Sequence, residues 1–441
     1  MVSLCGTIPP PPAPSPTTSR RPEDKGSVTD ASGERDVVVI GAGILGLAVA
    51  RELAQRHPDR SLTVLERESE VGVHQTGHNS GVVHAGVYYE PGSLKARLCV
   101  EGARRLYDYC DERGLAAERC GKVIVATHPG ELGRLDDLER RGRANGVPGL
   151  ARLGAGELAD VEPHVRGIAA LHSPATGIVD YRAVARALAT DVKASGGDVA
   201  TGCAIAGIAR AGGRMALRHA RGEVRPRHAI FCAGAWADRL AVAAGAPADP
   251  RIVPFRGAYG RLRPERRHLV RSLVYPVPDP ALPFLGVHLT RHVSGEVLVG
   301  PTALLAWGPD AYDLRGVSRP ELRRLLTWPG TWRMARRFWR TGVTEVHHAV
   351  SPSAFAAAAA RFVPELERGD VLPAFAGVRA QALGRDGGLV DDFVFSETGP
   401  ALHVRNAPSP AATSALAIAR LVADRAERTF GLARFGRSRN G

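Results

Sequence analysis

The sequence DVVVIGAGILGLAVARELAQRHPDRSLTVLE, residues 36–66, decides the fold. A β-branched run leads into Gly41-x-Gly43-x-x-Gly46, and a segment typical of a helix is followed by a second apolar strand that ends at Glu66. The first glycine permits a tight turn, the second lets a pyrophosphate approach the backbone, and the third lets the helix pack closely on the strand. This order of elements predicts a βαβ unit of the Rossmann type.

The same unit predicts a dinucleotide site. Phosphates would lie at the N-terminus of the first helix, where unpaired N–H groups and the positive end of the helix dipole favour anions. Glu66 follows the second strand, where its carboxylate can accept hydrogen bonds from a ribose diol. The alternative is a βαβ unit whose glycines serve packing alone, and the acid at the expected position favours the nucleotide.

Length, composition and charge limit the classes of protein that fit. The 441 residues are enough for two or three domains, and no apolar run reaches the roughly 18 residues that span a bilayer. The formal charge is +13, but only four of the 58 basic residues are lysines. We attribute the charge to an arginine-rich composition, so it does not indicate nucleic acid as a partner. The six cysteines form no CxxC pair, which favours a reducing, cytoplasmic location.

The first 34 residues are rich in proline and polar residues and lack the apolar core of a secretory signal, so we expect a disordered tail. Further on, three histidines, His74, His78 and His84, lie among glycines. The glycines prevent His74 and His78 from sharing a helical face, and no carboxylate or cysteine completes a ligand set. No metal site is therefore predicted.

The rest of the chain separates into two kinds of segment. The pattern predicts helices over residues 94–113, 131–145 and 179–195 and strands over 122–126, 203–208 and 228–236. Short strands broken by proline and glycine over 251–300 are typical of an antiparallel sheet. Helices are expected over 320–368, followed by two or three strands and a last helix.

These segments predict an α/β fold with two domains. The Rossmann-type domain is expected to be discontinuous, because later strands continue the opening sheet, and the antiparallel sheet with its helices forms a second, substrate-binding domain. The expected boundaries of the nucleotide domain are residues 35–100, 160–240 and 371–435, and those of the substrate domain are residues 101–159 and 241–370.

Several blocks of sequence resemble one family. The blocks are Gly41-x-Gly43-x-x-Gly46 with Glu66, HQTGHNSGVVHAGVYY from residue 74, PFRGAYGRL from 254, YPVPDPALPFLGVHLTR from 275, AGVRAQAL from 376 and NAPSPAATSALAIA from 406. Together they resemble the D-amino-acid-oxidase-like FAD-dependent oxidoreductase superfamily and, within it, the L-2-hydroxyglutarate oxidase/dehydrogenase family. The resemblance implies FAD and the oxidation of L-2-hydroxyglutarate to 2-oxoglutarate, with electrons passed to a quinone or to oxygen.

This chemistry requires a carboxylate clamp, a base for the hydroxyl proton and a flavin held face-on to Cα. Arg379 matches the carboxylate arginine of the superfamily, and an interdomain salt bridge is its alternative role. Arg256 and Tyr259 are candidates for a second anchor, although a turn arginine and a packed tyrosine would look the same. His84 is the preferred base and His288 its competitor, and a structural histidine is the alternative for each.

The resemblance also assigns cofactor contacts beyond the glycine turn and Glu66. Some of these contacts lie in the loop over the pyrophosphate and flavin. Others precede the last helix, whose N-terminus would stabilise an anionic reduced flavin. The matching positions are Asn79, Ser80, Gly81, Ile205, Gly234, Asn406, Ser409, Ala411 and Thr413.

Residues 321–340, ELRRLLTWPGTWRMARRFWR, carry three of the five tryptophans and six arginines. Tryptophan and arginine at helical spacing predict an interfacial helix on the inner, anionic face of a membrane, where reduced flavin could pass electrons to a quinone. The alternative is a helix that buries its tryptophans. For the whole chain, the alternatives to a hydroxy-acid dehydrogenase are a deaminating amino-acid oxidase and a non-catalytic basic flavoprotein.

Overall fold

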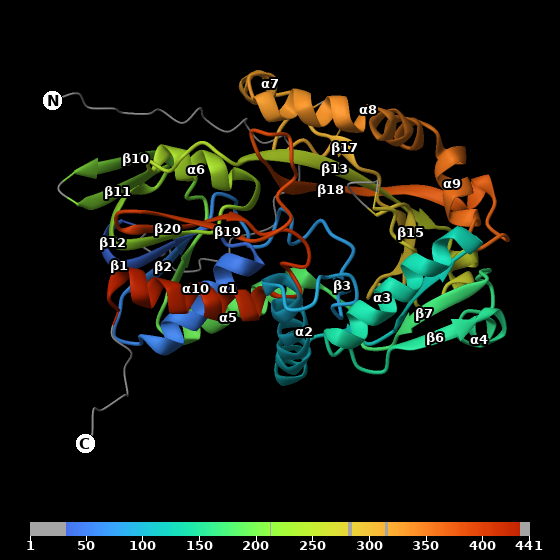
Figure 1. Ribbon diagram of the computed structural model, residues 1–441. Helices are drawn as coiled ribbons and strands as arrows, with labels where there is room; N and C mark the ends of the chain where they lie inside the picture. The colour runs from blue at the N-terminus through green and yellow to red at the C-terminus, as the bar shows by residue number, and fades with distance from the viewer. Residues whose placement is uncertain (1–31, 212, 281–284, 314–315, 433–441) are drawn as a thin grey trace, which may run out of the picture.

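The computed structural model describes residues 32–211, 213–280, 285–313 and 316–432. Most of the predicted N-terminal tail lies outside the described residues, and strand β1 (Gly33–Ile40) begins directly after it. Two large sheets dominate this part of the chain, and helices cover their faces (Figure 1). The arrangement confirms the predicted α/β class.

The first sheet contains the predicted Rossmann unit. In chain order its parallel strands are β1, β2 (Leu62–Leu65), β9 (Asp198–Ala200), β12 (Gly222–Phe231) and β20 (Ala401–Asn406). In space they are ordered β9-β2-β1-β12-β20, so the order reverses at β1. Ligands of such sheets bind outside the carboxyl ends of the strands at this reversal. Antiparallel strands extend the sheet, namely β10 (Ile205–Ala211), β11 (Arg214–His219) and β19 (Val394–Thr398).

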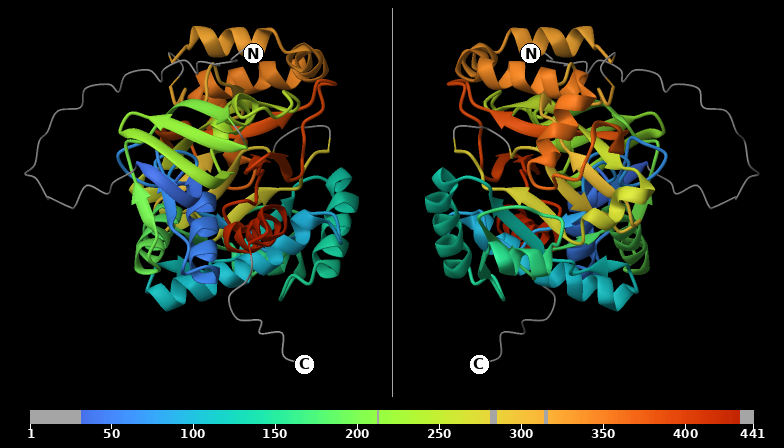
Figure 2. Two further views of the ribbon diagram at one scale, coloured as in Figure 1. Left: turned by 90° about the vertical axis from the view of Figure 1, so that its left-hand side faces the viewer. Right: turned by 90° about the vertical axis from the view of Figure 1, so that its right-hand side faces the viewer.

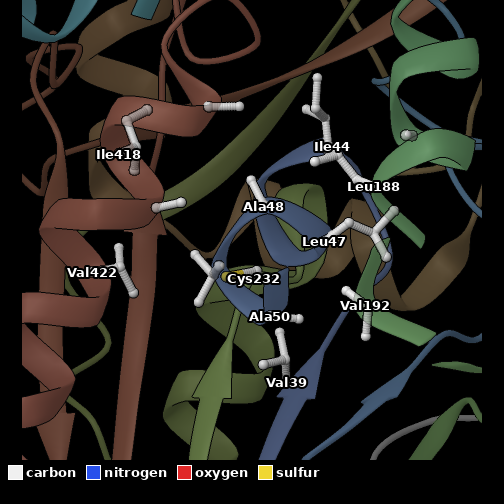
Figure 3. Close-up of a cluster of buried hydrophobic side chains, with 14 of the residues drawn as sticks. Val39, Ile44, Leu47, Ala48, Ala50, Leu188, Val192, Cys232, Ile418 and Val422 are labelled. Atoms are coloured by element: carbon white, nitrogen blue, oxygen red, sulfur yellow. The ribbon is translucent and has the colours of Figure 1, made fainter. Parts of the chain in front are cut away.

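Helix α1 (Ile44–Arg56) lies at the centre of the core of this half. It packs beside α5 (Tyr181–Ala194) and α10 (Ala415–Phe430) on one face of the sheet (Figure 1). Figure 3 shows the contact, in which the buried side chains of Leu47 and Ala48 on α1 lie among Val39, Leu188 and Ile418 from the surrounding elements. Because α1 and α10 come from opposite ends of the chain, this half closes only when the C-terminal helix docks.

The second sheet carries the predicted antiparallel pattern. Its order is β17-β13-β16-β15-β14-β5-β7-β6 with β18 paired to β13, and only β5 and β14 run parallel among its described pairs. Its strands are β5 (Lys122–Ala126), β6 (Ala151–Gly154), β7 (Ala169–Ser173), β13 (Arg251–Leu262), β14 (Leu273–Pro276), β15 (His288–Arg291), β16 (Val297–Gly300), β17 (Leu304–Leu305) and β18 (Val371–Leu383).

Two of the predicted domain boundaries differ from the structure. The predicted nucleotide domain includes β7 and β18, but β7 pairs with β5 and β6, and β18 pairs with β13 along most of its length. A strand sequence contains no local signal for the sheet that it joins, so neither pairing could be read from the segment itself. The remaining small sheet consists of β3 (Val82–Val83), β4 (Ala117–Glu118) and β8 (Gly177–Val179).

Caps set the ends of the helices. Helix α2 (Leu94–Arg113) begins where predicted because Ser93 Oγ accepts a hydrogen bond from Ala96 N. Helix α5 begins two residues later than predicted, because Asp180 accepts from the first backbone N–H groups and Val179 belongs to β8. The other helices are α3 (Leu132–Ala144), α4 (Ala155–Val161), α6 (Ala237–Ala243), α7 (Arg319–Leu326), α8 (Pro329–Val350) and α9 (Pro352–Ala360).

Helices α7 and α8 lie side by side along one edge of the molecule, and α2 lies at the opposite edge (Figure 2). Helix α8 is interrupted at Phe338, whose φ and ψ of −114° and 20° are not helical. Within the described ranges, the structure contains no helix with the length and apolar character that a membrane span requires.

Candidate active site

One large cavity lies at the carboxyl ends of the parallel strands and continues to the face of the second sheet. Its volume is about 1370 Å³. Residues that directly follow β1, β2 and β12 line one end, including Gly41, Glu66 and Gly234. Tyr259, His288 and Arg379 of the second sheet line the other end. The cavity therefore occupies the position that the strand order predicts for a ligand.

The glycine turn fits a bound phosphate. Gly41 has a φ of 104°, and a Cβ there would lie 2.5 Å from the Cys232 carbonyl oxygen, while a Cβ on Gly46 would lie 1.9 Å from the Gly41 oxygen. A Cβ on Gly43 would meet only Thr76 Oγ1, at 3.4 Å. Gly41 and Gly46 are thus required by the protein itself, whereas the space beside Gly43 opens into the cavity at the N-terminus of α1.

Glu66 lies at the cavity wall with 8% of its surface exposed. Its Oε2 accepts a hydrogen bond of 2.7 Å from Ala42 N, and its Oε1 accepts one of 3.0 Å from Glu68 N. A carboxylate has further acceptor positions, so Glu66 can receive ribose hydroxyls while it fixes the glycine turn. Ile205 lines the same end of the cavity, where the resemblance places the adenine.

The side-chain amide of Asn79 fixes the conformation of the loop after β2. Asn79 Nδ2 donates to the Gln75 and Thr76 carbonyl oxygens, and its Oδ1 accepts from Gly81 N. Asn79 and Ser80 line the cavity, but Gly81 does not. Gly81 is required for a different reason: its φ is 72°, and a Cβ would lie 2.8 Å from the Val179 oxygen. The structure therefore assigns Gly81 to the turn and not to a ligand contact.

The segment before α10 forms a further wall of the cavity. Asn406, Ser409, Ala411 and Thr413 all line it, as the resemblance implies. Asn406 Nδ2 donates to two backbone carbonyls, and its buried Oδ1 has no hydrogen-bond partner in the described part of the chain. Thr413 Oγ1 accepts a hydrogen bond of 3.1 Å from His84 N, so this segment also positions the predicted base.

The structure brings four of the five predicted substrate residues to the cavity. His84, Tyr259, His288 and Arg379 line it, but Arg256 does not. Arg256 lies on β13 between Ile252 and Gly257, which line the cavity, but it is not itself part of the cavity wall. Its Nε donates to the Tyr312 carbonyl oxygen over 2.7 Å. The structure therefore does not place Arg256, the predicted second substrate anchor, in the cavity wall, and this hydrogen bond ties it to a neighbouring loop.

His288 is buried, His84 is half-buried with a buried Nδ1, and the pKa of each is lowered. Burial, followed by the charges of Lys122, His288, Lys95 and Arg379, holds the pKa of His84 well below its ordinary value. Burial likewise lowers the pKa of His288 to about 3. His84 Nδ1 is buried without a hydrogen-bond partner among the described residues, whereas His288 Nδ1 donates to the Gly286 carbonyl oxygen. His84 Nδ1 and His288 Nε2 are therefore available to accept a proton.

Sequence reasoning missed four residues at this end of the cavity. Tyr88, Lys95 and Tyr275 line it, and Lys122 lies directly behind the two tyrosine rings. The sequence contained a signal for the lysines: the chain uses arginine almost throughout, and two of its four lysines are these buried residues. Lys95 Nζ pairs with Asp391 at 2.6 Å.

The three histidines of the glycine-rich segment do not form a metal-binding cluster. His74 contacts Glu68 and Tyr312, and His78 Nδ1 donates to backbone carbonyls of its own loop. His84 lies apart from both, at the substrate end. Among the residues described, no three histidines, cysteines or acids are placed to bind a metal ion.

Comparisons with known proteins place the chain in a family. Residues 36–425 match the DAO family, described as FAD dependent oxidoreductase. The chain is 43% identical to the mitochondrial L-2-hydroxyglutarate dehydrogenase of Homo sapiens over 93% of each chain. It is 42% identical to L-2-hydroxyglutarate dehydrogenase of Indibacter alkaliphilus over 89% of this chain and 99% of the other. Among solved structures, FAD-bound L-alpha-glycerophosphate oxidase from Mycoplasma pneumoniae superposes with a TM-score of 0.74 at 23% identity, covering 92% and 97% of the two chains.

Proposed function

We propose that this chain, which belongs to the DAO family of FAD-dependent oxidoreductases and within it to the L-2-hydroxyglutarate dehydrogenases, oxidises L-2-hydroxyglutarate to 2-oxoglutarate. The cofactor is FAD. When bound, FAD supplies the acceptor for the hydride that leaves Cα. The glycine turn, Glu66 and the segment 404–413 would hold it, because these residues line the cavity continuously from the first sheet toward the second.

The observation that carries this proposal is the chemistry of the substrate end. Arg379 lines the cavity, Lys122 lies behind its tyrosine rings and Lys95 is paired with Asp391, while His84 and Tyr88 offer buried polar atoms without partners among the described residues. Such surroundings favour an anionic substrate. An amino acid would bring an ammonium group into the same positive field, which opposes its binding. The site therefore supports a hydroxy diacid over the deaminating alternative.

The residues divide the reaction between them. The Arg379 guanidinium matches a carboxylate with two parallel hydrogen bonds and thereby orients Cα. His84 Nδ1 is our choice for accepting the hydroxyl proton, because it is buried, lines the cavity and has no described partner of its own. His288 Nε2 is the second candidate. Tyr259 and Tyr275 exclude water from the same wall.

An anaerobic titration tests the proposal. The purified yellow protein is mixed with L-2-hydroxyglutarate, D-2-hydroxyglutarate or L-glutamate, and the flavin absorbance is followed. We expect only the L-hydroxy acid to bleach the flavin rapidly. Bleaching by L-glutamate would instead establish the amino-acid oxidase, and a flavoprotein that none of the three reduces would refute the proposed reaction.

The electron acceptor and location are a separate part of the proposal. We propose that α7 and α8 dock on an anionic membrane surface and that a quinone reoxidises the enzyme. On α8, Trp332 and Trp339 are each 60% exposed, and Val343 is 63% exposed. Exposed arginines flank them, which suits a negatively charged lipid surface. The third tryptophan, Trp328, is 2% exposed and packs in the core, so it does not belong to this surface.

Helix α8 also reaches the active-site cavity. Arg337, Phe338, Arg340 and Thr341 line the cavity, so a docked α8 would bring the cavity close to the lipid surface. This supports a lipid-soluble acceptor such as a quinone. For the side of the membrane we keep the cytoplasmic face, supported by the free cysteines of the described chain, although the animal relatives are named as mitochondrial.

Vesicle co-sedimentation tests the docking surface. Wild-type protein is compared with a Trp332→Ser, Trp339→Ser variant on vesicles with and without anionic lipid. An Ile168→Ser, Val242→Ser variant is the matched control, because both residues are exposed and apolar but lie outside α7 and α8. We expect the tryptophan variant to pellet less than the other two on anionic vesicles. Equal pelleting of all three would remove the proposal.

A further inference from the structure

Lys122 is a buried base that the reaction described above does not use. It is the first residue of β5 and lies in the middle of the second sheet, paired with Leu273 on β14 and Ser173 on β7. Its surface is 1% exposed. Its Nζ lies 4.4 Å from the centroid of the Tyr275 ring and 4.9 Å from that of Tyr88. The ammonium therefore faces the rings of two tyrosines that line the cavity.

No anion in the described structure compensates this charge. Lys122 forms no ion pair with an acid in the described part of the chain, unlike Lys95, which contacts Asp391. The potential anions near it are the thiols of Cys99 on α2 and Cys120 just before β5. Burial raises the pKa of these thiols to about 12 and about 11, so both are neutral. A buried ammonium without a counter-charge is costly, which indicates that the counter-charge comes with a ligand.

The other groups around Lys122 are cations or neutral donors. His84 and His288 lie within its electrostatic influence, and Arg379 in turn acts on both histidines. Tyr88 Oη is buried and has no hydrogen-bond partner among the described residues, although Tyr88 lines the cavity. A hydroxyl in this position can donate to an anion in the cavity, and a cation behind its ring strengthens that interaction.

We propose that Lys122 is the positioning residue for the second carboxylate of the substrate, which receives its hydrogen bond from the Tyr88 hydroxyl while Arg379 holds the carboxylate next to Cα. The inference rests on the proposed function and deepens it. It makes Lys122 and Tyr88 responsible for the preference for a diacid over a 2-hydroxy acid with one carboxylate. It also gives these two residues the role predicted for Arg256, which does not line the cavity.

The charge state of Lys122 gives the proposal a second measurable consequence. Burial lowers the pKa of Lys122 to about 7. A carboxylate bound beyond Tyr88 favours the charged amine and raises that pKa again. At mildly alkaline pH, binding of a diacid is therefore coupled to uptake of a proton by Lys122. Binding of a monocarboxylate, which reaches only Arg379, is not.

The first test is substrate discrimination. Lys122→Met, Lys122→Arg and Tyr88→Phe are compared with wild type on L-2-hydroxyglutarate and L-2-hydroxyvalerate, which has one carboxylate. We expect Lys122→Met to lose roughly 30-fold in kcat/KM on the diacid, mainly through KM, and several-fold less on the monocarboxylate. Lys122→Arg should recover part of the loss. Equal losses on both substrates, or no loss, would overturn the proposal.

The second test does not depend on turnover. Glutarate, a diacid without the hydroxyl, is bound to the FAD-loaded protein in a calorimeter in buffers of different ionisation enthalpy. At about pH 8 we expect wild type to take up close to one proton and Lys122→Met to take up almost none. Persistent uptake in Lys122→Met would assign the proton to His84 or His288 and refute the role of Lys122.

Leu273→Met is the control for packing, because Leu273 is the buried neighbour of Lys122 across the β5/β14 ladder. It should bind FAD and retain the diacid preference and the proton uptake. If Lys122→Met does not fold, the proposal is tested by proton uptake in wild type and by the substrate preference of Tyr88→Phe. It is refuted if wild type takes up no proton when glutarate binds and Tyr88→Phe keeps the preference for the diacid. Failure of wild type to oxidise L-2-hydroxyglutarate would instead refute the proposed function, and the glutarate experiment would still test Lys122.

Discussion

Replacement of Lys122 by methionine tests whether this lysine serves function or stability. If it serves function, its removal should raise the free energy of unfolding; if it supports the fold, its removal should lower that free energy. Burial lowers the pKa of Lys122 from 10.5 to about 7. In the unfolded chain the amine regains its ordinary pKa, so between these two values the unfolded state binds a proton that the folded state has released. The free energy of unfolding therefore rises with pH across this window, by up to about 1.4 kcal/mol per pH unit.

Below about pH 7 both states carry the proton, and the folded protein bears the full cost of the buried charge. The difference 10.5 − 7 = 3.5 units corresponds to roughly 5 kcal/mol, which is an upper limit. Replacement of buried charges by apolar groups of similar volume typically stabilises by about 1–4 kcal/mol. We expect Lys122→Met to raise the free energy of unfolding by roughly this amount near pH 6.5 and by little near pH 10.

Urea unfolding at a fixed excess of FAD, followed by tryptophan fluorescence, measures this difference. Wild type and Lys122→Met are compared at several pH values, so that every other titrating group cancels. The two stabilities should converge as the pH rises. A variant that is less stable than wild type by the same amount at every pH would show that Lys122 supports the fold, and the reasoning above would then be refuted.

Three further predictions concern the cofactor and the clamp. Arg379→Lys should raise KM for L-2-hydroxyglutarate by roughly 10- to 100-fold at unchanged FAD content, because a point charge replaces a two-pronged donor; an unchanged KM would contradict the clamp. Glu66→Ala should lose FAD on dialysis without altering kcat per remaining flavin, and full flavin occupancy would contradict its role. Gly43→Ala should fold but bind FAD weakly, whereas Gly46→Ala should fail to fold stably, because its Cβ would lie 1.9 Å from the Gly41 oxygen; circular dichroism and flavin absorbance distinguish the two.

The nucleotide half could be predicted from the sequence because its decisive interactions are local. Gly41 and Gly46 meet within a few residues of each other, and Ser93 caps the helix that it directly precedes. Such contacts depend on the residues of one segment, so the segment alone specifies them. The later members of the site required a family resemblance, since Asn406 and Thr413 line the same cavity as the glycine turn but lie near the other end of the described chain.

The substrate half could not be predicted to the same depth, because strand pairing decides it. A shift of one residue along β13 changes which side chains face the cavity, and the sequence around Arg256 and Tyr259 does not fix that choice. The group formed by Lys122, Tyr88 and Tyr275 comes from three separate parts of the chain. Only the pairing of β5 with β14 brings two of them together.

The positive field of the cavity links substrate binding to the base. Without a bound substrate, Lys122 and Arg379 both act to lower the pKa of His84, so the imidazole is a weak base. A bound dianion places two negative charges among the same cations, and its field raises the pKa of His84 toward the range in which an imidazole accepts a proton efficiently. A monocarboxylate supplies only one of these two negative charges. The same cations would then select the diacid twice, once through affinity and once through the strength of the base that the substrate itself activates.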